Sequence, residues 1–462
     1  MIEAIAGVNA LKKRAHHLPA VAGAESEELY SDDCSYADDT DSSRTESVPL
    51  MDPSKGKSPG AKSPGMRSPF GMRSPFGMRA KSPGFSSLDF DLSKKMELAQ
   101  MAHMLFGRRG NMAFYACTIV YLYGDLAIYA VAVPKSLREI MCPRPSADVA
   151  VWQCSDRFTS ADLYRLLVVI FGLLLGPFAF GNVQKTRTLQ FVTTAIRHVS
   201  FGLMIVLAVL GIARGQGRSV ADVLAYEKPA SLTTFFGVCI YSFMCHHSIP
   251  GLVAPITDKS KVGVVLASSF AAVLLVYFVL CTSATFRFQP DDIDDVYTLN
   301  FKKYPVQFIA YFLSLFPVFT LSANFPLICI TLRENVRHLA HALTGAHQSQ
   351  DAAEDRPASF AEFLERNVHA FVALVPPLVV AFFTEDVSML VGFTGAYAGL
   401  GIQWIVPTCL VWSLRRRLVR EGLADRAANQ FASPFKHNAW LWLTFACSLV
   451  SVALITLSHS LK

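Results

Sequence analysis

The sequence is poor in charged residues and in paired cysteines. Only 17% of its 462 residues are Asp, Glu, Lys or Arg, whereas 52% are hydrophobic. A soluble domain is usually about 25% charged. The ten cysteines include no C-x-x-C pair, so the usual zinc and dithiol motifs are absent. N-x-S/T sequons, Walker motifs, nucleophile elbows and zinc-binding helices are absent too. We therefore expect no enzyme, no nucleic-acid binding, no metal and no cofactor.

The sequence does contain long apolar runs. Most of them exceed the roughly 20 residues that a helix needs to cross a bilayer. Because backbone polar groups in lipid need internal partners, such runs are helical. The sequence predicts an all-α polytopic membrane protein whose domain at 112–458 lies in the lipid bilayer with about nine transmembrane helices. Their ranges are 112–133, 163–180, 189–213, 232–256, 262–286, 305–331, 367–383, 387–411 and 438–458.

A different composition precedes this domain. Residues 1–11 are apolar but too short to span a bilayer, and residues 12–90 join an acidic stretch to a repeat rich in Pro and Gly. Such a segment buries too little apolar surface to fold, which predicts a disordered linker. It serves either as an inert spacer or as a platform for partners and proline-directed kinases, because Lys or Arg precedes each Ser-Pro, at Ser58, Ser63, Ser68, Ser74 and Ser82.

Residues 91–111 predict a short amphipathic helix between this linker and the membrane domain. Apolar side chains recur there near the helical period of 3.6 residues. They are Leu92, Met96, Ala99, Ala102, Leu105 and Phe106.

Lysine and arginine predict the orientation of the spans. The linker and the loops on its side carry most of these residues, with 415–417 as the strongest single marker, which places the linker in the cytosol. Nine spans then put the C-terminus in the extracellular or lumenal space. Cys142 and Cys154 share one loop on that outer side and can close a disulfide there. Residues 46–51 resemble an acidic dileucine sorting signal, which favours an endolysosomal membrane.

Asp125 is an ionisable residue about midway along the first span. Because a charge inside the bilayer is costly, such a residue is a functional-site hypothesis by default. The carboxylate can bind a cation, relay a proton or pair with Arg197 of the third span. Arg197 and His198 lie near the inner third of their helix, where an arginine can also snorkel toward the interface.

The fourth run is interrupted by residues that disfavour a helix. Gly237, Pro250, Gly251 and Pro255 break its helical propensity, and unwound helices near the midplane expose backbone to substrate in many secondary transporters. Polar groups accompany the break. One of two adjacent histidines is a candidate proton-linked group, although side chains about 100° apart on a helix make a poor metal pair. These polar residues are Ser242, Cys245, His246 and His247.

Two later runs carry polar or small residues. Thr320, Ser322 and Asn324 lie within one turn of the sixth run and suit either a Na⁺ site or interhelical hydrogen bonds. The eighth run holds four glycines, which favour close helix packing. They are Gly392, Gly395, Gly399 and Gly401.

Several long motifs resemble the transmembrane protein 104 family, a divergent branch of the amino acid/auxin permease superfamily. They are VYLYGDLAIYAVAVP (120–134), GPFAFGNVQKTRTLQ (176–190), FGVCIYSFMCHHSIPGLVAP (236–255), LFPVFTLSANFP (315–326) and GFTGAYAGLGIQWIVP (392–407). The resemblance implies an inverted-repeat amino acid transporter fold of eleven helices, with substrate between the broken first and sixth helices. Residues 1–14 resemble the cytosolic end of the second family helix. We therefore expect the 462-residue chain by itself not to transport.

The resemblance also implies residue roles. The run at 232–256 corresponds to the sixth family helix, and the hydroxyl-bearing eighth family helix falls on Thr320 and Ser322. The implied function is secondary transport of a small neutral amino acid driven by H⁺ or Na⁺. The alternative is a non-transporting sensor or signalling scaffold that keeps the fold. Candidate ion-coupling residues are Asp125, His247, Thr320, Ser322 and Asn324, and candidate substrate-binding residues are Gly237, Tyr241, Ser242, Phe243, Cys245 and His246.

Overall fold

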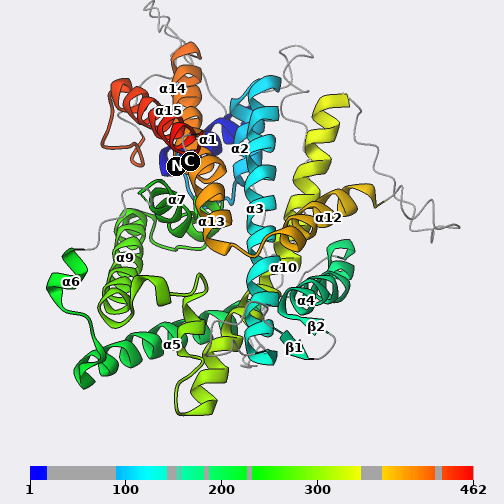
Figure 1. Ribbon diagram of the computed structural model, residues 1–462. Coiled ribbons are helices and arrows are strands. Elements are labelled where there is room, and N and C mark those ends of the chain that lie inside the picture. Colours follow the sequence, from blue (N-terminus) through cyan, green and yellow to red (C-terminus); the bar gives the residue numbers. More distant parts are fainter. Residues whose placement is uncertain are drawn as a thin grey trace, which may run out of the picture.

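The computed structural model is mostly helical (Figure 1). It describes residues 1–17, 90–142, 153–155, 158–181, 187–225, 232–344, 367–421 and 429–460. Most of the predicted linker, including all five Ser-Pro sites, lies outside the described residues.

In this part of the chain, seven helices are long and apolar enough to cross a membrane. The two remaining predicted runs form a broken pair, α7 (Leu232–Ser242) and α8 (Ile249–Val253), and a shorter helix, α12 (Val368–Phe383). The prediction of an all-α polytopic membrane protein is confirmed. The seven spans are α3 (Arg108–Met141), α4 (Ser160–Leu175) with η1 (Gly176–Phe180), α5 (Arg187–Gly211) with η2 (Ile212–Gln216), α9 (Val262–Arg287), α10 (Gln307–Thr344), the composite from α13 (Val387–Thr394) through η7 (Gly395–Gly399) and η8 (Gly401–Ile405) to α14 (Val406–Arg420), and α15 (Asn438–Ser460).

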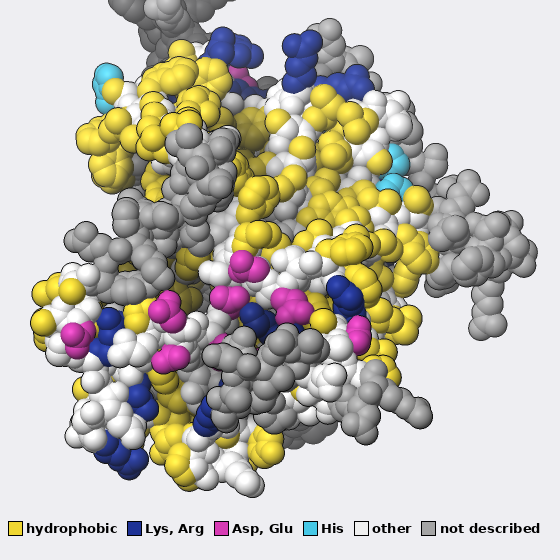
Figure 2. Space-filling model, in the orientation of Figure 1, with side chains coloured by type: hydrophobic (Ala, Val, Ile, Leu, Met, Phe, Trp, Pro, Cys, Tyr) yellow, Lys and Arg dark blue, Asp and Glu magenta, His cyan; other side chains and the backbone are white. Residues whose placement is uncertain are grey.

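Helix α3 is the central element of the fold. It runs through the middle of the bundle and packs against α10, α12, α4 and α13 (Figure 1). Its buried face joins their apolar side chains in one core cluster. Figure 2 shows a broad hydrophobic band on one face, with Lys and Arg at its upper edge and a belt of acidic and basic side chains below it. This distribution suits a bundle that meets lipid around its waist.

The two N-terminal helices differ from the sequence prediction. Helix α1 (Ile2–His17) extends beyond the apolar stretch 1–11, whereas α2 covers only Leu98–Leu105 of the helix expected at 91–111. The Asn9 side-chain amide donates to the backbone carbonyls of Asp91 and Lys94, at 2.9 and 3.3 Å. These tertiary hydrogen bonds hold 90–97 in a non-helical path, and a Glu97–Gln100 capping box then starts the helix.

Glycines set the spacing between α3, α7 and α13. A Cβ added at Gly237 would lie 2.1 Å from the carbonyl oxygen of Gly392, and one at Gly395 would lie 1.9 Å from the carbonyl oxygen of Gly237. A Cβ at Gly124 would lie 2.2 Å from the Thr394 hydroxyl. The backbones of α7 and of α13 with η7 therefore approach each other closely, and Gly124 lets α3 pack against the Thr394 side chain. Gly237, expected to bind substrate, is therefore placed in a helix–helix contact.

A two-stranded hairpin and several short helices complete the described fold. Strands β1 (Gln153–Ser155) and β2 (Phe158–Thr159) pair antiparallel after α3. Short helices α6 (Val220–Leu224), η4 (Lys259–Lys261), η5 (Pro290–Asp292) and η6 (Tyr297–Phe301) lie in the connections around α9.

Candidate functional site

The break between α7 and α8 lies at residues 243–248. Turn hydrogen bonds replace the helical pattern there, from the Met244 N–H to the Tyr241 carbonyl at 3.1 Å and from the Ser248 N–H to the Cys245 carbonyl at 2.9 Å. Pro250 stands in the first turn of α8, where its missing N–H costs no hydrogen bond. The interruption expected from the Gly and Pro residues is present, and it leaves backbone groups at the break without regular helical partners.

Asp125 of α3 faces this break. Its side chain is 4% exposed, and the Tyr241 hydroxyl at the end of α7 donates to its Oδ1 at 2.6 Å. Tyr121, one turn earlier on α3, lies near the same carboxylate. Among the described residues, Asp125 forms no ion pair with Arg197. The carboxylate is thus held by the Tyr241 hydroxyl instead of by a neighbouring cation.

The two adjacent histidines have different surroundings. The His247 ring lies 5.7 Å from the ring of Tyr121, centroid to centroid. The Nδ1 of His246 is buried and has no hydrogen-bond partner in the described part of the structure. Within the same residues, no group of three or more His, Cys, Asp or Glu side chains could hold a metal ion. His247, a residue of the break, therefore lies beside Tyr121 of α3.

Aromatic contacts join the break to α9. The Phe243 ring lies 6.4 Å from Phe270 and 5.8 Å from Tyr277. The hydroxyl of the neighbouring Ser242 donates to the Val238 carbonyl of its own helix at 2.8 Å. Of the expected substrate residues, Tyr241 and Phe243 thus contact α3 and α9, whereas Ser242 is bonded within α7.

The expected sodium-binding cluster lies on α10. The buried Thr320 hydroxyl donates to the Phe316 carbonyl of the same helix at 2.9 Å, and Ser322 and Asn324 are half-buried. A hydroxyl that donates to its own helix keeps lone pairs but has its proton committed. The Thr320 hydrogen bond is intrahelical, so it matches neither the Na⁺ site nor the interhelical hydrogen bonds that the sequence left open.

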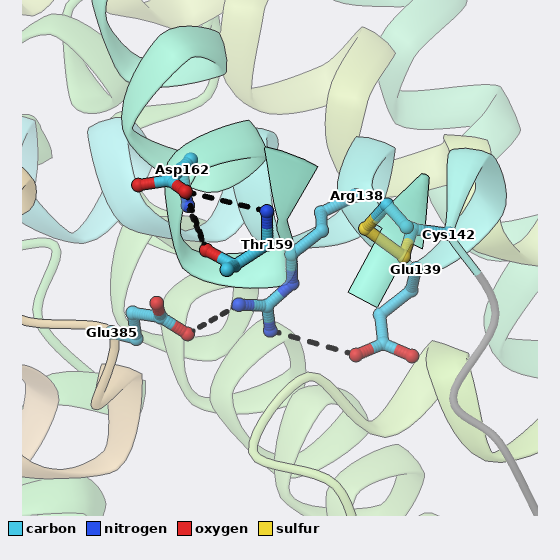
Figure 3. The surroundings of a disulfide bond; sticks show 7 residues. Arg138, Glu139, Cys142, Thr159, Asp162 and Glu385 are labelled. Atoms are coloured by element: carbon cyan, nitrogen blue, oxygen red, sulfur yellow. Dashed lines mark hydrogen bonds and ion pairs between the residues drawn. A yellow bond between two sulfur atoms is a disulfide. The ribbon is translucent and has the colours of Figure 1, made fainter. Parts of the chain in front are cut away.

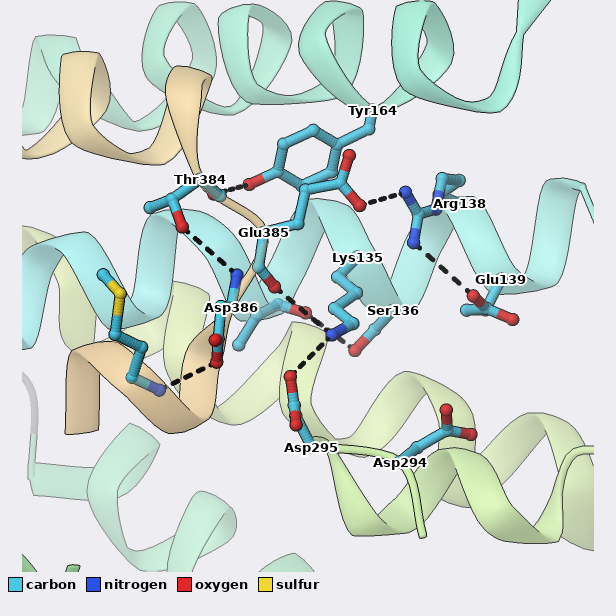
Figure 4. Close-up of polar contacts among 12 residues, drawn as sticks. Lys135, Ser136, Arg138, Glu139, Tyr164, Asp294, Asp295, Thr384, Glu385 and Asp386 are labelled. Carbon is cyan, nitrogen blue, oxygen red and sulfur yellow. Dashed lines mark hydrogen bonds and ion pairs between the residues drawn. The ribbon is translucent and has the colours of Figure 1, made fainter. Parts of the chain in front are cut away.

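A charge network that the sequence analysis missed lies at the far end of α3. Arg138 forms an ion pair with Glu385, which follows α12, and a second one with Glu139 at 3.6 Å (Figures 3 and 4). Lys302 binds Glu139 at 2.7 Å, and Lys135 binds Asp295 at 3.0 Å. The acidic loop residues were visible in the sequence, but the network joins three separate segments: the end of α3, residues 294–302 and Glu385.

The same end of α3 carries the disulfide. Cys142, directly after α3, is bonded to Cys154 of β1, with Cα atoms 5.2 Å apart (Figure 3). The bond ties the β1–β2 hairpin to the helix that also supplies Arg138 and Glu139. The disulfide thus holds the hairpin at one end of the central helix.

The opposite end of the bundle holds a buried ion pair. Arg415 of α14 binds Glu3 of α1 in a bidentate manner, at 2.7 and 2.9 Å, and the Ser433 N–H donates to the same carboxylate at 2.9 Å. Nearby, Lys13 lies 3.5 Å from Asp91. Burial opposes ionisation of Asp91, but hydrogen bonds from Ser93 and the Lys13 charge outweigh it and hold the pKa of the Asp91 carboxyl below its usual value.

Comparison with known proteins identifies the family of this chain. Residues 93–457 match the family model described as transmembrane amino acid transporter protein. Transmembrane protein 104 of Homo sapiens is 39% identical over 389 residues, which cover 80% of this chain and 75% of that protein. The homologue of Drosophila melanogaster is 38% identical over 397 residues, with 80% and 74% covered. That of Dictyostelium discoideum is 35% identical over 396 residues, with 81% and 74% covered. The chain belongs to the transmembrane protein 104 family, within the transmembrane amino acid transporter proteins.

Proposed function

We propose that the protein is a secondary transporter of small neutral amino acids. One observation carries the proposal: a buried carboxylate in the central helix, Asp125, accepts a hydrogen bond from Tyr241 at the edge of a helix break. In secondary transporters, broken helices offer free backbone donors and carbonyls to the substrate. A carboxylate beside such a break can link substrate binding to the binding of a cation. Membership of an amino acid transporter family supports the substrate class.

Of the two coupling ions, H⁺ and Na⁺, the surroundings of Asp125 favour H⁺. Tyr241 directs its hydroxyl proton at the carboxylate, whereas a metal ion needs several oxygens that present lone pairs. Protonation requires only that one tyrosine hydroxyl rotate and accept. His247, beside Tyr121, extends the chain of titratable groups toward the break.

Flux measurements test this proposal. The protein is reconstituted into proteoliposomes, both as the 462-residue chain and as a longer form that includes the first family helix. Uptake of labelled alanine, serine and glutamine is followed with no gradient, with a pH gradient and with a Na⁺ gradient. We expect the longer form to accumulate amino acid under the pH gradient and the 462-residue chain not to do so. Accumulation under Na⁺ alone would overturn the choice of ion, and specific amino acid binding without flux would favour the sensor or scaffold alternative.

We also propose the orientation expected from the sequence, with the linker in the cytosol and the C-terminus outside the cytosol. Helices α1 and α2, which flank the linker, pack against α14 and its run of arginines. The disulfide lies at the other end of α3, and disulfides persist in extracellular or lumenal compartments. Both features agree with the positive-inside pattern. Residence in an endolysosomal membrane is the matching proposal from residues 46–51.

A further inference from the structure

Residues 384–386 join α12 to α13 at the end of the bundle that carries the disulfide. Thr384 and Asp386 both have extended backbone angles, with φ and ψ of −132° and 141° for the first and −87° and 93° for the second. The Asp386 carboxylate accepts a hydrogen bond from the Met389 N–H at 2.8 Å and so caps α13. Hinges consist of a few such residues at the ends of elements, where changes in φ and ψ reorient the elements. This connection therefore has the form of a hinge.

Three side chains from two other helices hold this connection (Figure 4). Lys135 of α3 donates to the Glu385 carbonyl at 3.2 Å, and Arg138, one turn later, binds the Glu385 carboxylate. The Tyr164 hydroxyl of α4 donates to the Thr384 carbonyl at 3.0 Å. The Arg138 guanidinium also lies over the Tyr164 ring, 5.5 Å from its centroid. Lys135, Arg138 and Tyr164 together form a latch on the hinge.

The latch can open at modest cost. Arg138 and Glu139 are only 5% and 8% exposed, and the Lys302–Glu139 pair at 2.7 Å ties the loop before α10 to them. The Glu385 side chain, in contrast, is 39% exposed. An ion pair with a partly hydrated partner contributes less than a fully buried one. When Glu385 leaves, it turns to water, and Arg138 keeps Glu139 at 3.6 Å as its partner.

Helix α13 connects the hinge to the candidate site. It begins at Val387 and leads, eight positions further on, to Gly395, a distance of about 12 Å along a helix. A Cβ added at Gly395 would lie 1.9 Å from the Gly237 carbonyl oxygen and 3.0 Å from the Cβ of Tyr241. Tyr241 is the residue whose hydroxyl bonds Asp125. A rotation of α13 about residues 384–386 therefore moves the wall against which the broken helix packs.

We propose that residues 384–386 are a gating hinge, held closed by Lys135, Arg138 and Tyr164. With the latch formed, α13 lies against α7, and Asp125 is sealed from the disulfide end of the bundle. When the latch opens, α13 swings away from α7, and Asp125 becomes reachable from that end, as alternating access requires. This inference rests on the proposed transport function.

Hydrogen–deuterium exchange of the protein in lipid nanodiscs tests the hinge without any substrate. Glu385→Ala removes the carboxylate that Arg138 binds, and Tyr164→Phe removes the hydroxyl that bonds Thr384. We expect the amides of residues 384–395 to exchange about tenfold faster in Glu385→Ala, because hydrogen bonds between charged groups are among the strongest. The rise in Tyr164→Phe should be smaller, since the lost hydrogen bond is neutral.

Glu334→Ala is the matched control. Glu334 pairs with Arg333 in the second half of α10 at 2.9 Å, so its loss should leave exchange at residues 384–395 unchanged. Unchanged exchange there in both hinge variants, or faster exchange throughout the protein, would overturn the hinge.

Amino acid uptake into proteoliposomes is measured for the same variants, and Glu385→Ala should alter the maximal rate. Faster exchange at residues 384–395 with an unaltered maximal rate would show that the hinge does not gate transport. If the wild type carries no amino acid, the proposed function fails, and the gating role fails with it, whereas the exchange data still decide whether the hinge exists.

Discussion

At the scale of single residues, the buried charges of this protein fall into two groups. Glu3 and Arg415 neutralise each other in a bidentate pair that a backbone N–H completes. Asp125, within the part of the chain that the structure describes, forms no ion pair and accepts a hydrogen bond from the Tyr241 hydroxyl. The first arrangement stabilises a fixed contact, whereas the second leaves a carboxylate free to change its charge without losing a cationic partner. We therefore propose a structural role for Glu3 and a coupling role for Asp125.

Replacing Asp125 by Asn should abolish ion-driven accumulation while leaving the protein abundant and monodisperse. The amide keeps the shape and can still accept from Tyr241, but it cannot bind a proton or balance a cation. Uptake with and without a pH gradient measures the effect. Tyr123→Phe, which removes a hydroxyl that donates to the Val372 carbonyl instead, is the control. Undiminished coupling in Asp125→Asn would exclude this carboxylate as the coupling group.

Removing one partner of the Glu3–Arg415 pair should destabilise the protein by about 3–5 kcal/mol, because the other charge is left buried and unpaired. Glu3→Gln and Arg415→Met are compared with the double variant by thermal unfolding in detergent. The double variant should lose less than the sum of the single losses. Strictly additive losses would show that the two side chains act independently.

At the scale of helices, backbone contact between α7 and α13 positions the site. Tyr241 reaches Asp125 because α7 lies against the glycines of α13 at Gly237. The same contact places the break beside α3, which packs on α13 through Gly124. Glycines that look like simple packing residues therefore set the distance at which the hydroxyl and the carboxylate meet.

A methyl group at position 237 should separate these helices. In Gly237→Ala the new Cβ would collide with the Gly392 carbonyl, which is backbone and cannot rotate away. Overpacking of this kind costs about 1–3 kcal/mol, and we expect a lower unfolding temperature and loss of uptake. Gly202→Ala is the matched control, since a Cβ at Gly202 in α5 meets nothing within 4 Å. Equal behaviour of the two variants would contradict the contact.

At the scale of the whole molecule, the two ends of the bundle are held by different bonds. One end has the disulfide and the belt of ion pairs from Lys135 to Glu385 (Figure 4). The other has the Glu3–Arg415 pair and the arginines of α14. A disulfide at one end and arginines at the other agree with an oxidising compartment on the first side and the cytosol on the second.

Epitope tags test this orientation. A tag after Lys462 should be detected only when the lumenal or extracellular side is opened, whereas a tag in the linker should be detected after permeabilisation of the plasma membrane alone. Mass spectrometry of non-reduced peptides should recover Cys142 joined to Cys154. Detection of both tags under the same mild condition would overturn the proposed odd number of spans.

The sequence by itself determined the helical class and the positions of the spans. Hydropathy over about 20 residues is a local property, and lipid leaves the backbone no alternative to helix. The break in the fourth run was likewise readable, because Pro and Gly act on their own turn. The helix predicted at 91–111 was too long for the opposite reason, since the Asn9 amide that holds its first residues lies more than 80 positions away.

Only the tertiary structure decided the partners of the charges. Asp125 and Tyr241 are 116 positions apart, and Glu3 and Arg415 are 412 apart, so no spacing rule joins them. The sequence left Asp125 pairing with Arg197, binding a cation or relaying a proton, and packing of α7 on α13 brought the Tyr241 hydroxyl to it. Hydrophobic length selects which segments enter the membrane. Which side chains meet inside it depends on helix contacts that sequence periodicity does not encode.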